Sequence, residues 1–237
     1  MKLTYILSTM LATTLFMSTV EAETKFAPIT MESGLMIFIP YETTASIPPS
    51  TISDELANTL SYMGNEERLA YDVYNRLYAE WGIKQFTNIA NNSEVKHITA
   101  VQNLIKTYKL NENIMFTNID LEELGYSDTN VENMVAGVYD ISKIQRLYDD
   151  LVSIGLRSEE DALKVACTIE VVDIDDLDAY IKIAEASKAE DVIETFIYLR
   201  NGSYNHYWSF DKGLKNRGLK DGCCTWDALC HPEYPQN

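Results

Sequence analysis

Six ionisable side chains interrupt the apolar stripes of four helical segments that the sequence predicts. They are Glu67 in the first segment, Glu94 and His97 in the second, Glu170 and Asp173 in the third, and His206 in the fourth. Each falls near the middle of a stripe whose other positions are mostly apolar, at alternating spacings of three and four residues. An isolated carboxylate in such a core would be strongly destabilising or would take up a proton. The four carboxylates and two imidazoles are therefore predicted to share a pair of divalent cations.

The ligand types indicate which metal this site would take. Carboxylates combined with imidazoles suit iron or manganese, and two of the chain's three histidines lie on these stripes. Four carboxylates with two histidines is also the ligand ratio of dinuclear iron sites in four-helix bundles. We therefore expect two iron ions, with manganese as the alternative.

Glu94 and His97 form an ExxH pair, which places both side chains on one helix face about one turn apart. The pair alone is a weak signal, because it arises by chance in many helices and a lone histidine is more often structural. Its weight comes from the acidic and histidine positions on the other three segments.

The first segment offers two adjacent acids. Glu66 competes with Glu67 for the inward position, and the spacing to Ala70 and Tyr74 favours Glu67. Tyr74 belongs to a group of tyrosines crowded in this segment. At helical spacing we interpret it as a core residue rather than a redox-active one.

Caps and periodicity place the first two helices. Ser53 can cap a helix that starts with two acidic residues, and Gly82 ends it after Trp81. A short turn leads to Thr87, where a second helix begins and runs to about Tyr108. The two helices are expected to form a tight hairpin.

The second pair of helices follows a long connection, residues 110–157, with one short helix expected from Ser142 to Ile154. Ser158 opens the third helix ahead of three acidic residues. Ser187, with Glu190 three residues later, predicts a capping box for the fourth. Two long helices, a long crossover and two more helices are the arrangement of an all-α, ferritin-like four-helix bundle.

The two ends of the chain differ from the bundle in composition. Residues 1–22 hold one lysine, an apolar run and the small-x-small ending Val20-Glu21-Ala22, which predicts a signal peptide cleaved after Ala22 rather than an uncleaved anchor. We expect an arm at residues 23–52, the bundle at 53–215 and a cysteine-containing tail at 216–237. The protein is accordingly expected to be secreted, periplasmic or at the cell surface.

The formal charge of −17 separates the chain from proteins that bind nucleic acid. Only 19 basic side chains accompany 36 acidic ones, so no basic stripe could neutralise phosphates. Such an acidic surface favours solubility outside the cytoplasm. No stretch beyond the N-terminal run approaches a membrane span, so we expect no stable membrane insertion after cleavage.

Three of the four cysteines crowd the C-terminus of a chain that is expected to reach an oxidising compartment. A disulfide from Cys230 to Cys223 or Cys224 is expected. A small metal clip that includes His231 is the alternative, although the spacing matches no zinc signature. Cys167 lies inside a helical pattern and is expected to be a buried small hydrophobe.

Several stretches of the chain together resemble a known family. They are Glu66 to Tyr74 (EERLAYDVY), Asn88-Ile89-Ala90 with Ser93-Glu94 and His97, Asp161 to Val165 (DALKV) with Ile169-Glu170, and Gly202-Ser203 with Asn205-His206. Over residues 56–215 this pattern resembles the ferritin-like family called domain of unknown function 2202, and its first half is similar to rubrerythrins. The resemblance implies a di-iron fold without assigning a reaction.

The fourth helix departs from the wider di-iron pattern. A second ExxH pair is expected there, but Ser203 stands three residues before His206. Asp173, one turn beyond Glu170, would supply the missing carboxylate as a ligand or would orient a ligating histidine. If Asp173 does neither, the site is mononuclear or has an unusual second metal position.

Three functions are compatible with these residues. The first is an exported di-iron oxidoreductase acting on dioxygen or peroxide, in which a bridging carboxylate holds the irons about 4 Å apart. It would need an external electron donor, because the chain has no rubredoxin-like cysteine pairs, and it could work as a homodimer. The second is iron binding or ferroxidation without an organic substrate. The third is a bundle that binds a partner without catalysis, and metal content separates it from the other two.

Overall fold

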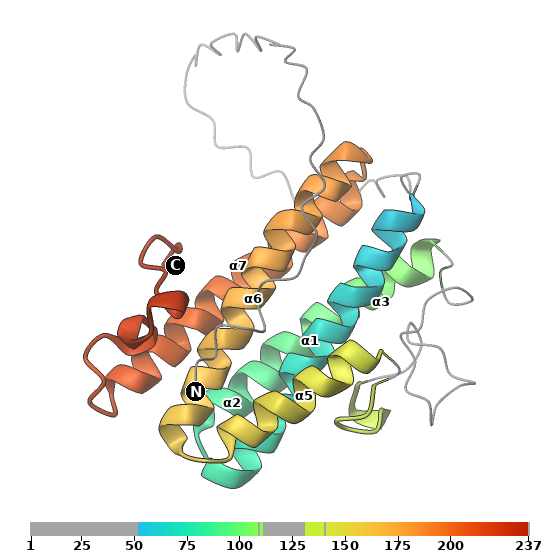
Figure 1. The fold of residues 1–237 in the computed structure, drawn as a ribbon. Coiled ribbons are helices and arrows are strands. Elements are labelled where there is room, and N and C mark those ends of the chain that lie inside the picture. The colour runs from blue at the N-terminus through green and yellow to red at the C-terminus, as the bar shows by residue number, and fades with distance from the viewer. Residues whose placement is uncertain (1–51, 109, 111–130, 140, 237) are drawn as a thin grey trace, which may run out of the picture. The chain divides into compact units, whose positions relative to one another are not determined.

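The computed structural model describes residues 52–108, 110, 131–139 and 141–236. The expected signal peptide, residues 1–22, lies outside these ranges, and so does the expected arm at 23–52 apart from Ile52. Within the described residues the chain is all-α, as predicted. Long helices form a four-helix bundle with a long crossover between its two halves (Figure 1).

The first helix, α1, runs from Asp54 to Trp81, as the sequence predicts. Ser53 has an extended backbone, and its Oγ accepts a hydrogen bond from the Leu56 amide at 3.2 Å. Gly82 ends the helix with a φ of 64°, in the left-handed region where glycine has no Cβ to clash. These two caps fix where α1 begins and ends.

The second helical segment is longer and less regular than predicted. It begins with α2, Lys84–Ile89, three residues before the expected start at Thr87. It then passes through a π-helical turn, Ala90–Glu94, into α3, Val95–Tyr108. The regular spacing of apolar residues gives no warning of a π-helical turn, which inserts one extra residue into the helical repeat. Its last residue is one of the predicted metal ligands.

The helices α6, Glu159–Ala186, and α7, Glu190–Lys215, form the second pair. Ser158 caps α6 as predicted, because its Oγ accepts a hydrogen bond from the Asp161 amide at 3.0 Å. Figure 1 shows α6 and α7 side by side along the bundle.

The predicted capping box at the start of α7 is wrong. The N-cap residue is Ala189, which makes no side-chain capping hydrogen bond. Ser187 has helical backbone angles, φ −85° and ψ −7°, and closes α6 instead. The chain reverses direction between the two helices through Lys188, whose φ is 54°. A serine that still belongs to the preceding helix cannot adopt the extended backbone of an N-cap.

The crossover contains the short helix α5, Ser142–Gly155, one residue longer than predicted. It packs on both α1 and α6 and therefore covers one side of the bundle (Figure 1). Before α5, a 3-10 turn at Val131–Asn133 leads into the loop residues 134–139.

A buried arginine ties that loop to α1. Arg68 donates hydrogen bonds of 2.8 and 2.7 Å to the carbonyl oxygens of Val135 and Val138. Asp72, one turn later on α1, accepts a hydrogen bond of 2.6 Å from the hydroxyl of Tyr139. The guanidinium of Arg68 also lies 4.5 Å from the Tyr139 ring centroid. The crossover is thus fixed to α1 by buried polar contacts.

Two apolar clusters fill the bundle on either side of a polar layer. One cluster includes Tyr74, Phe86 and Phe210, whose ring centroids lie 5.1 to 5.9 Å apart. The other includes Leu60 and Phe196. The layer between them, called the polar layer below, consists of six buried residues: Glu67, Glu94, His97, Glu170, Asp173 and His206.

Two disulfides tie the C-terminal tail together. Cys224 pairs with Cys230, one of the two pairings predicted. Cys167 of α6 is buried as predicted, but it is not simply a small hydrophobe, because it forms a disulfide with Cys223. Sequence reasoning missed this bond because 56 residues separate its cysteines. The alternative metal clip has no thiolate left, and the Nδ1 of His231 lies 2.9 Å from a Glu233 oxygen instead.

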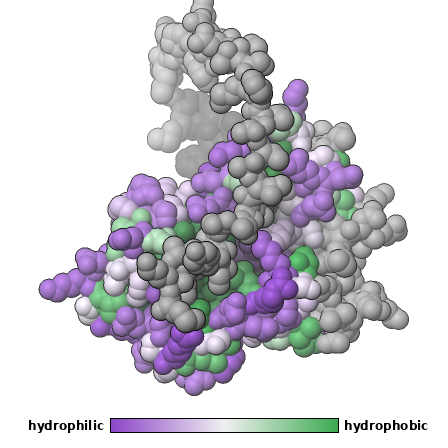
Figure 2. All heavy atoms as spheres, in the orientation of Figure 1, coloured by the Kyte–Doolittle hydropathy of each residue, from purple (hydrophilic) through white to green (hydrophobic). Residues whose placement is uncertain are grey.

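The described surface is mixed in character. Figure 2 shows one face that is largely hydrophilic, with apolar side chains gathered in separate patches. Among the described helices, none combines the length and apolar character needed to cross a membrane.

Candidate metal centre

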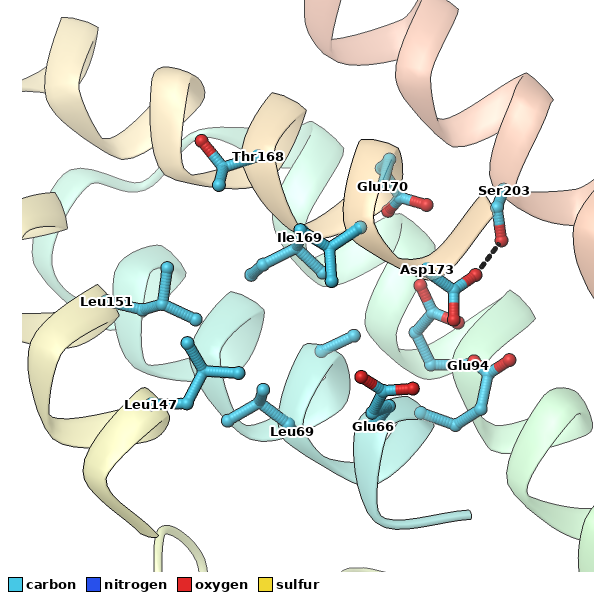
Figure 3. A pocket seen from close by; sticks show the side chains of 13 residues that line it. Glu66, Leu69, Glu94, Leu147, Leu151, Thr168, Ile169, Glu170, Asp173 and Ser203 are labelled. Carbon is cyan, nitrogen blue, oxygen red and sulfur yellow. Dashed lines mark hydrogen bonds between the residues drawn. The ribbon is translucent and has the colours of Figure 1, made fainter. Parts of the chain in front are cut away.

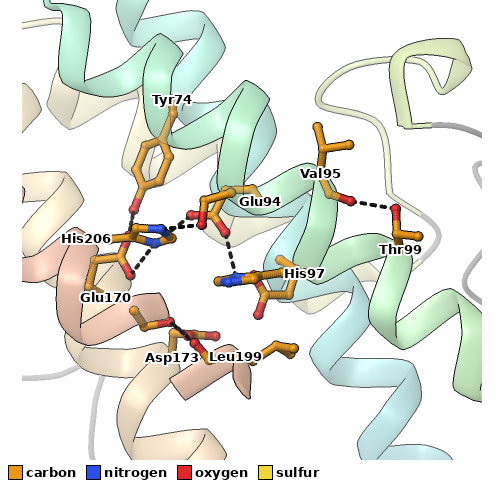
Figure 4. A network of polar contacts seen from close by, with 12 residues as sticks. Tyr74, Glu94, Val95, His97, Thr99, Glu170, Asp173, Leu199 and His206 are labelled. Carbon is orange, nitrogen blue, oxygen red and sulfur yellow. Dashed lines mark hydrogen bonds and ion pairs between the residues drawn. The ribbon is translucent and has the colours of Figure 1, made fainter. Parts of the chain in front are cut away.

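Glu94 lies at the centre of the polar layer (Figure 4). Its Oε2 is 3.0 Å from His97 Nδ1, and its Oε1 is 3.1 Å from His206 Nδ1. The side chain is only 2% exposed. One carboxylate therefore faces both histidines through different oxygens, which is the arrangement a bridging ligand needs.

Two further glutamates complete a donor group on each side of Glu94. Glu67 of α1 places Oε2 3.0 Å from His97 Nδ1. Glu170 of α6 places Oε2 3.4 Å from His206 Nδ1. The structure thus brings five of the predicted residues together as two groups, each with one histidine and one glutamate of its own and with Glu94 in common.

Neighbouring groups fix the orientation of both imidazole rings. Ser93, in the π-helical turn, has its Oγ 2.7 Å from His206 Nε2, which leaves Nδ1 for the carboxylates. The Nε2 of His97 faces α7 at Gly202, where a Cβ atom would lie only 2.4 Å from it. Ser93 and Gly202 therefore set which ring nitrogen each histidine presents to the site.

Hydroxyl groups hold two of the carboxylates. The Tyr74 hydroxyl donates a 2.5 Å hydrogen bond to Glu170 Oε1, opposite the oxygen that faces His206. The Ser203 hydroxyl donates a 2.5 Å hydrogen bond to Asp173 Oδ2. Sequence reasoning treated Tyr74 as core packing alone and therefore missed its polar contact.

Asp173, the sixth predicted residue, lies in the same region but contacts Ser203 instead of a histidine. It is 8% exposed and lines one pocket together with Glu67, Glu94 and Glu170. Its hydrogen bond to Ser203 joins α6 to α7 at the position where a second ExxH glutamate would stand. Whether Asp173 binds metal directly or orients its neighbours stays a prediction.

Burial and mutual charge alter the acidity of these groups. Burial raises the pKa of Glu67 to about 7, although nearby His97 opposes the change. Burial would also raise the pKa of Glu94, but His206 and His97 together lower it below its ordinary value. Burial raises the pKa of Asp173 well above its usual range, and Glu67 and Glu170 add to the effect.

The histidines show the complementary change. Burial disfavours the charged form of His206, but Glu94 and Glu170 outweigh it and raise the pKa to about 10. Glu67 and Glu94 likewise raise the pKa of His97 well above its usual range against the opposing effect of burial. Protonated imidazoles thus compensate the carboxylates when protons are the only cations at hand, and a bound metal ion would take over that role.

Two buried polar atoms show that the residues present fit a metal ion. Glu67 Oε1 is shielded from solvent and makes no hydrogen bond, and His206 Nδ1 is held between Glu94 and Glu170 by ion-pair contacts without a well-directed hydrogen bond. Donor atoms of Glu94, His97 and His206 also lie within 4.8 Å of one another. Buried groups normally find partners, so incompletely paired donors converging on one place suit a shared cation. Oxygen and imidazole nitrogen donors are those that iron and manganese accept.

A pocket of about 60 Å³ opens onto this layer between α1, α5 and α6 (Figure 3). Apolar side chains such as Leu147 of α5 form one side, and carboxylates form the other. Glu66 lines it as well as Glu67, so the two adjacent acids both face inward. The signal that could have revealed Glu66 is a second apolar stripe at helical spacing, through Leu69 and Val73, which α5 helps to bury.

Comparison with known proteins gives consistent matches. A family model described as "Uncharacterized protein domain (DUF2202)" matches residues 56–224. The uncharacterized protein MJ0754 of Methanocaldococcus jannaschii is 37% identical over 174 residues, 73% of this chain and 83% of the relative. The crystal structure of hypothetical protein MJ0754 from Methanococcus jannaschii DSM 2661 matches with a TM-score of 0.62 at 36% identity, covering 73% of this chain and 87% of that chain. The chain therefore belongs to the DUF2202 family, as its motifs predicted.

Proposed function

We propose that the protein is an exported dinuclear metal protein, with two iron ions as the expected cofactor and manganese as the alternative, acting as an oxidoreductase on dioxygen or peroxide. The observation that carries this proposal is Glu94, whose two oxygens face His97 and His206 in a buried layer. Glu67 and His97 would hold one ion, Glu170 and His206 the other, and Glu94 would bind both. Two iron ions held by these residues would supply electrons and Lewis acidity for the reaction with a small oxidant.

The residues around the centre would exclude water from it and orient its carboxylates. The apolar clusters on both sides exclude water, which strengthens electrostatic interactions within the layer. Tyr74 holds a proton at its hydroxyl and orients Glu170 through it. Asp173 adds a fourth carboxylate, and because Ser203 occupies its Oδ2, direct binding would use Oδ1.

The cysteines indicate where the electrons for the reaction would come from and where the protein would be located. Each of the four is joined in a disulfide, so they offer no thiolates for a redox-active iron centre, and electrons would come from a separate donor. Structural disulfides are typical of secreted and periplasmic proteins, which supports the proposal of export. Mass spectrometry of the native protein should then show a mature chain that begins at Glu23. A mature chain that retains Met1 would contradict export.

Anaerobic loading of the purified protein with ferrous iron tests the proposed function. We expect about two metal ions per chain and their oxidation on exposure to dioxygen or peroxide. Elemental analysis measures the first quantity, and optical and Mössbauer spectra measure the second. Near-zero binding would instead favour a partner-binding bundle, and stable binding without oxidation would indicate a structural metal site. Turnover of iron without any reducible or oxidisable organic substrate would favour ferroxidation.

A further inference from the structure

A line of carboxylates leads out of the polar layer along α6. Glu170, Asp173 and Asp176 are spaced three residues apart, so they lie on one helix face with a rise of about 4.5 Å per step. Glu170 is 2% exposed, Asp173 is 8% exposed, and Asp176 is half-buried. The line therefore runs from the buried centre towards the surface of the bundle.

Glu66 of α1 faces the outer part of this line. Its carboxyl shares a hydrogen bond with that of Asp176. Glu66 is only 6% exposed, yet its Oε2 has no hydrogen-bond partner, and it lines the pocket shown in Figure 3 together with Asp173. A buried carboxylate oxygen without a partner is costly, so this oxygen is positioned to bind something that the pocket admits.

The charged neighbours of Glu66 are mostly acidic. Asp176 and Asp173 both act electrostatically on its carboxyl group. Lys143 of α5 opposes this effect, but its Nζ lies over the Tyr62 ring, 4.4 Å from the centroid, rather than in an ion pair with Glu66. Apolar walls from α5 and α6 intensify the field of these carboxylates, because they exclude water from the pocket.

We propose that Glu66 and Asp176 form a third divalent-cation site, from which metal ions pass to the dinuclear centre by way of Asp173. The ligands are carboxylate oxygens, so the site takes hard divalent cations such as Mn²⁺ and Fe²⁺ and holds them weakly. Binding at Glu66 and Asp176 is independent of the proposed function, whereas passage to the centre rests on it.

Manganese titration tests the site without any catalytic assay. Free Mn²⁺ is measured by electron paramagnetic resonance against full-length protein, and bound Mn²⁺ is located by anomalous scattering from soaked crystals. We expect a weak third ion between the Glu66 and Asp176 carboxylates. Glu66→Gln and Asp176→Asn should each weaken that ion roughly tenfold or more while leaving the two ions of the centre in place. Glu185→Gln removes an exposed carboxylate from the same helix α6 and is the matched control, expected to bind like the wild type.

The rate of metal loading tests passage. Clefts lined by charges of one sign raise the arrival rate of counter-ions by tenfold or more, so filling of the centre by Mn²⁺ should slow by roughly tenfold in Glu66→Gln. Circular dichroism of each variant checks that the helices remain. The double variant His97→Ala/His206→Ala, which removes ligands of the centre, should still bind one ion at Glu66 and Asp176.

The outcomes are distinguishable from those of the proposed function. A single ion at Glu66 and Asp176 with an unfilled centre would support the third site and contradict both passage and the dinuclear function. A filled centre with no anomalous peak at Glu66 and unchanged loading in Glu66→Gln would overturn the inference and leave the dinuclear function standing. Loss of every ion in the histidine double variant would also overturn an independent third site.

Discussion

The two helix pairs of the bundle contribute to the polar layer in similar but unequal ways. In each pair the first helix supplies a glutamate, Glu67 or Glu170, and the second supplies a histidine presented through Nδ1. The difference lies three residues before each histidine, where one pair has Glu94 and the other has Ser203. Asp173 of α6 accepts a hydrogen bond from Ser203. The neighbouring helix α6 thus provides a carboxylate at the place where α7 has none. A motif search along α7 alone would miss this relation.

The two helix pairs also differ in the interactions that fix them to neighbouring segments. The pair formed by α6 and α7 is joined to the tail by the Cys167–Cys223 disulfide, one turn from Glu170. The pair formed by α1 and α2–α3 has no disulfide among its described residues and relies on Arg68 to fix the crossover. Covalent support in one half and buried polar contacts in the other should make the halves respond differently to substitution.

The largest expected effect comes from the carboxylate that the two halves share. Glu94→Ala should abolish binding of both metal ions, whereas His97→Ala and His206→Ala should each reduce the stoichiometry from about two to about one. Elemental analysis after anaerobic loading measures this, and the circular dichroism signal should remain, because alanine favours helix. His231→Ala, which changes the third histidine in the tail, is the control. Two ions retained in Glu94→Ala would show that the halves are independent sites.

The two disulfides, both of which involve the C-terminal tail, give the next largest effect. The chain-entropy relation predicts a loss of about 4 kcal/mol in the free energy of unfolding for Cys167→Ala/Cys223→Ala, whose cysteines are 56 residues apart, and about 2 kcal/mol for Cys224→Ala/Cys230→Ala, 6 apart. Urea unfolding measures both. Equal losses in the two variants would mean that the tail, rather than its link to α6, is what stabilises the second pair.

Gly202 links the two halves of the bundle, because it lies on α7 and contacts His97 of α3. Gly202→Ala places a Cβ only 2.4 Å from His97 Nε2, so the ring must shift and its Nδ1 loses its present position against the Glu67 and Glu94 carboxylates. Metal affinity on the His97 side should fall roughly tenfold or more. Gly213→Ala on the same helix, where a Cβ would meet its nearest atoms at 3.2 Å, is the matched control. Isothermal titration of both variants would reject this role of Gly202 if their affinities were the same.

Much of this architecture could be predicted because single residues carry the decisive signals. Ser53, Gly82 and Ser158 end or begin their helices as expected, since each side chain or backbone conformation acts locally. The buried stripes followed from periodicity, and the charges on them marked the polar layer. The capping box predicted at Ser187 was wrong because a local sequence pattern does not show whether a residue ends one helix or begins the next.

The remaining features depend on contacts between distant segments. The bond between Cys167 and Cys223 requires α6 and the tail to meet, with Cα atoms 6.0 Å apart. Glu66 is buried where α5 packs on α1; the apolar Leu69 and Val73 indicate a second buried face there, but they do not tell which distant segment covers it. The π-helical turn that carries Ser93 adds one residue to the helical repeat, and apolar periodicity does not reveal it.

The smallest expected effect concerns the hydroxyl that orients Glu170, and it also has a pH dependence. Tyr74→Phe removes the proton donor to Glu170 Oε1, so the carboxylate can rotate and metal affinity on the His206 side should fall about tenfold. Burial already raises the pKa of Glu170 and the Tyr74 hydrogen bond lowers it, so the variant's pKa should be higher still. Metal binds the deprotonated carboxylate, so the deficit should be larger at pH 6 than at pH 8. Mn²⁺ titrations at both pH values measure this, with Tyr198→Phe, whose side chain is 48% exposed, as the control. A deficit that stayed constant with pH would assign Tyr74 to packing alone.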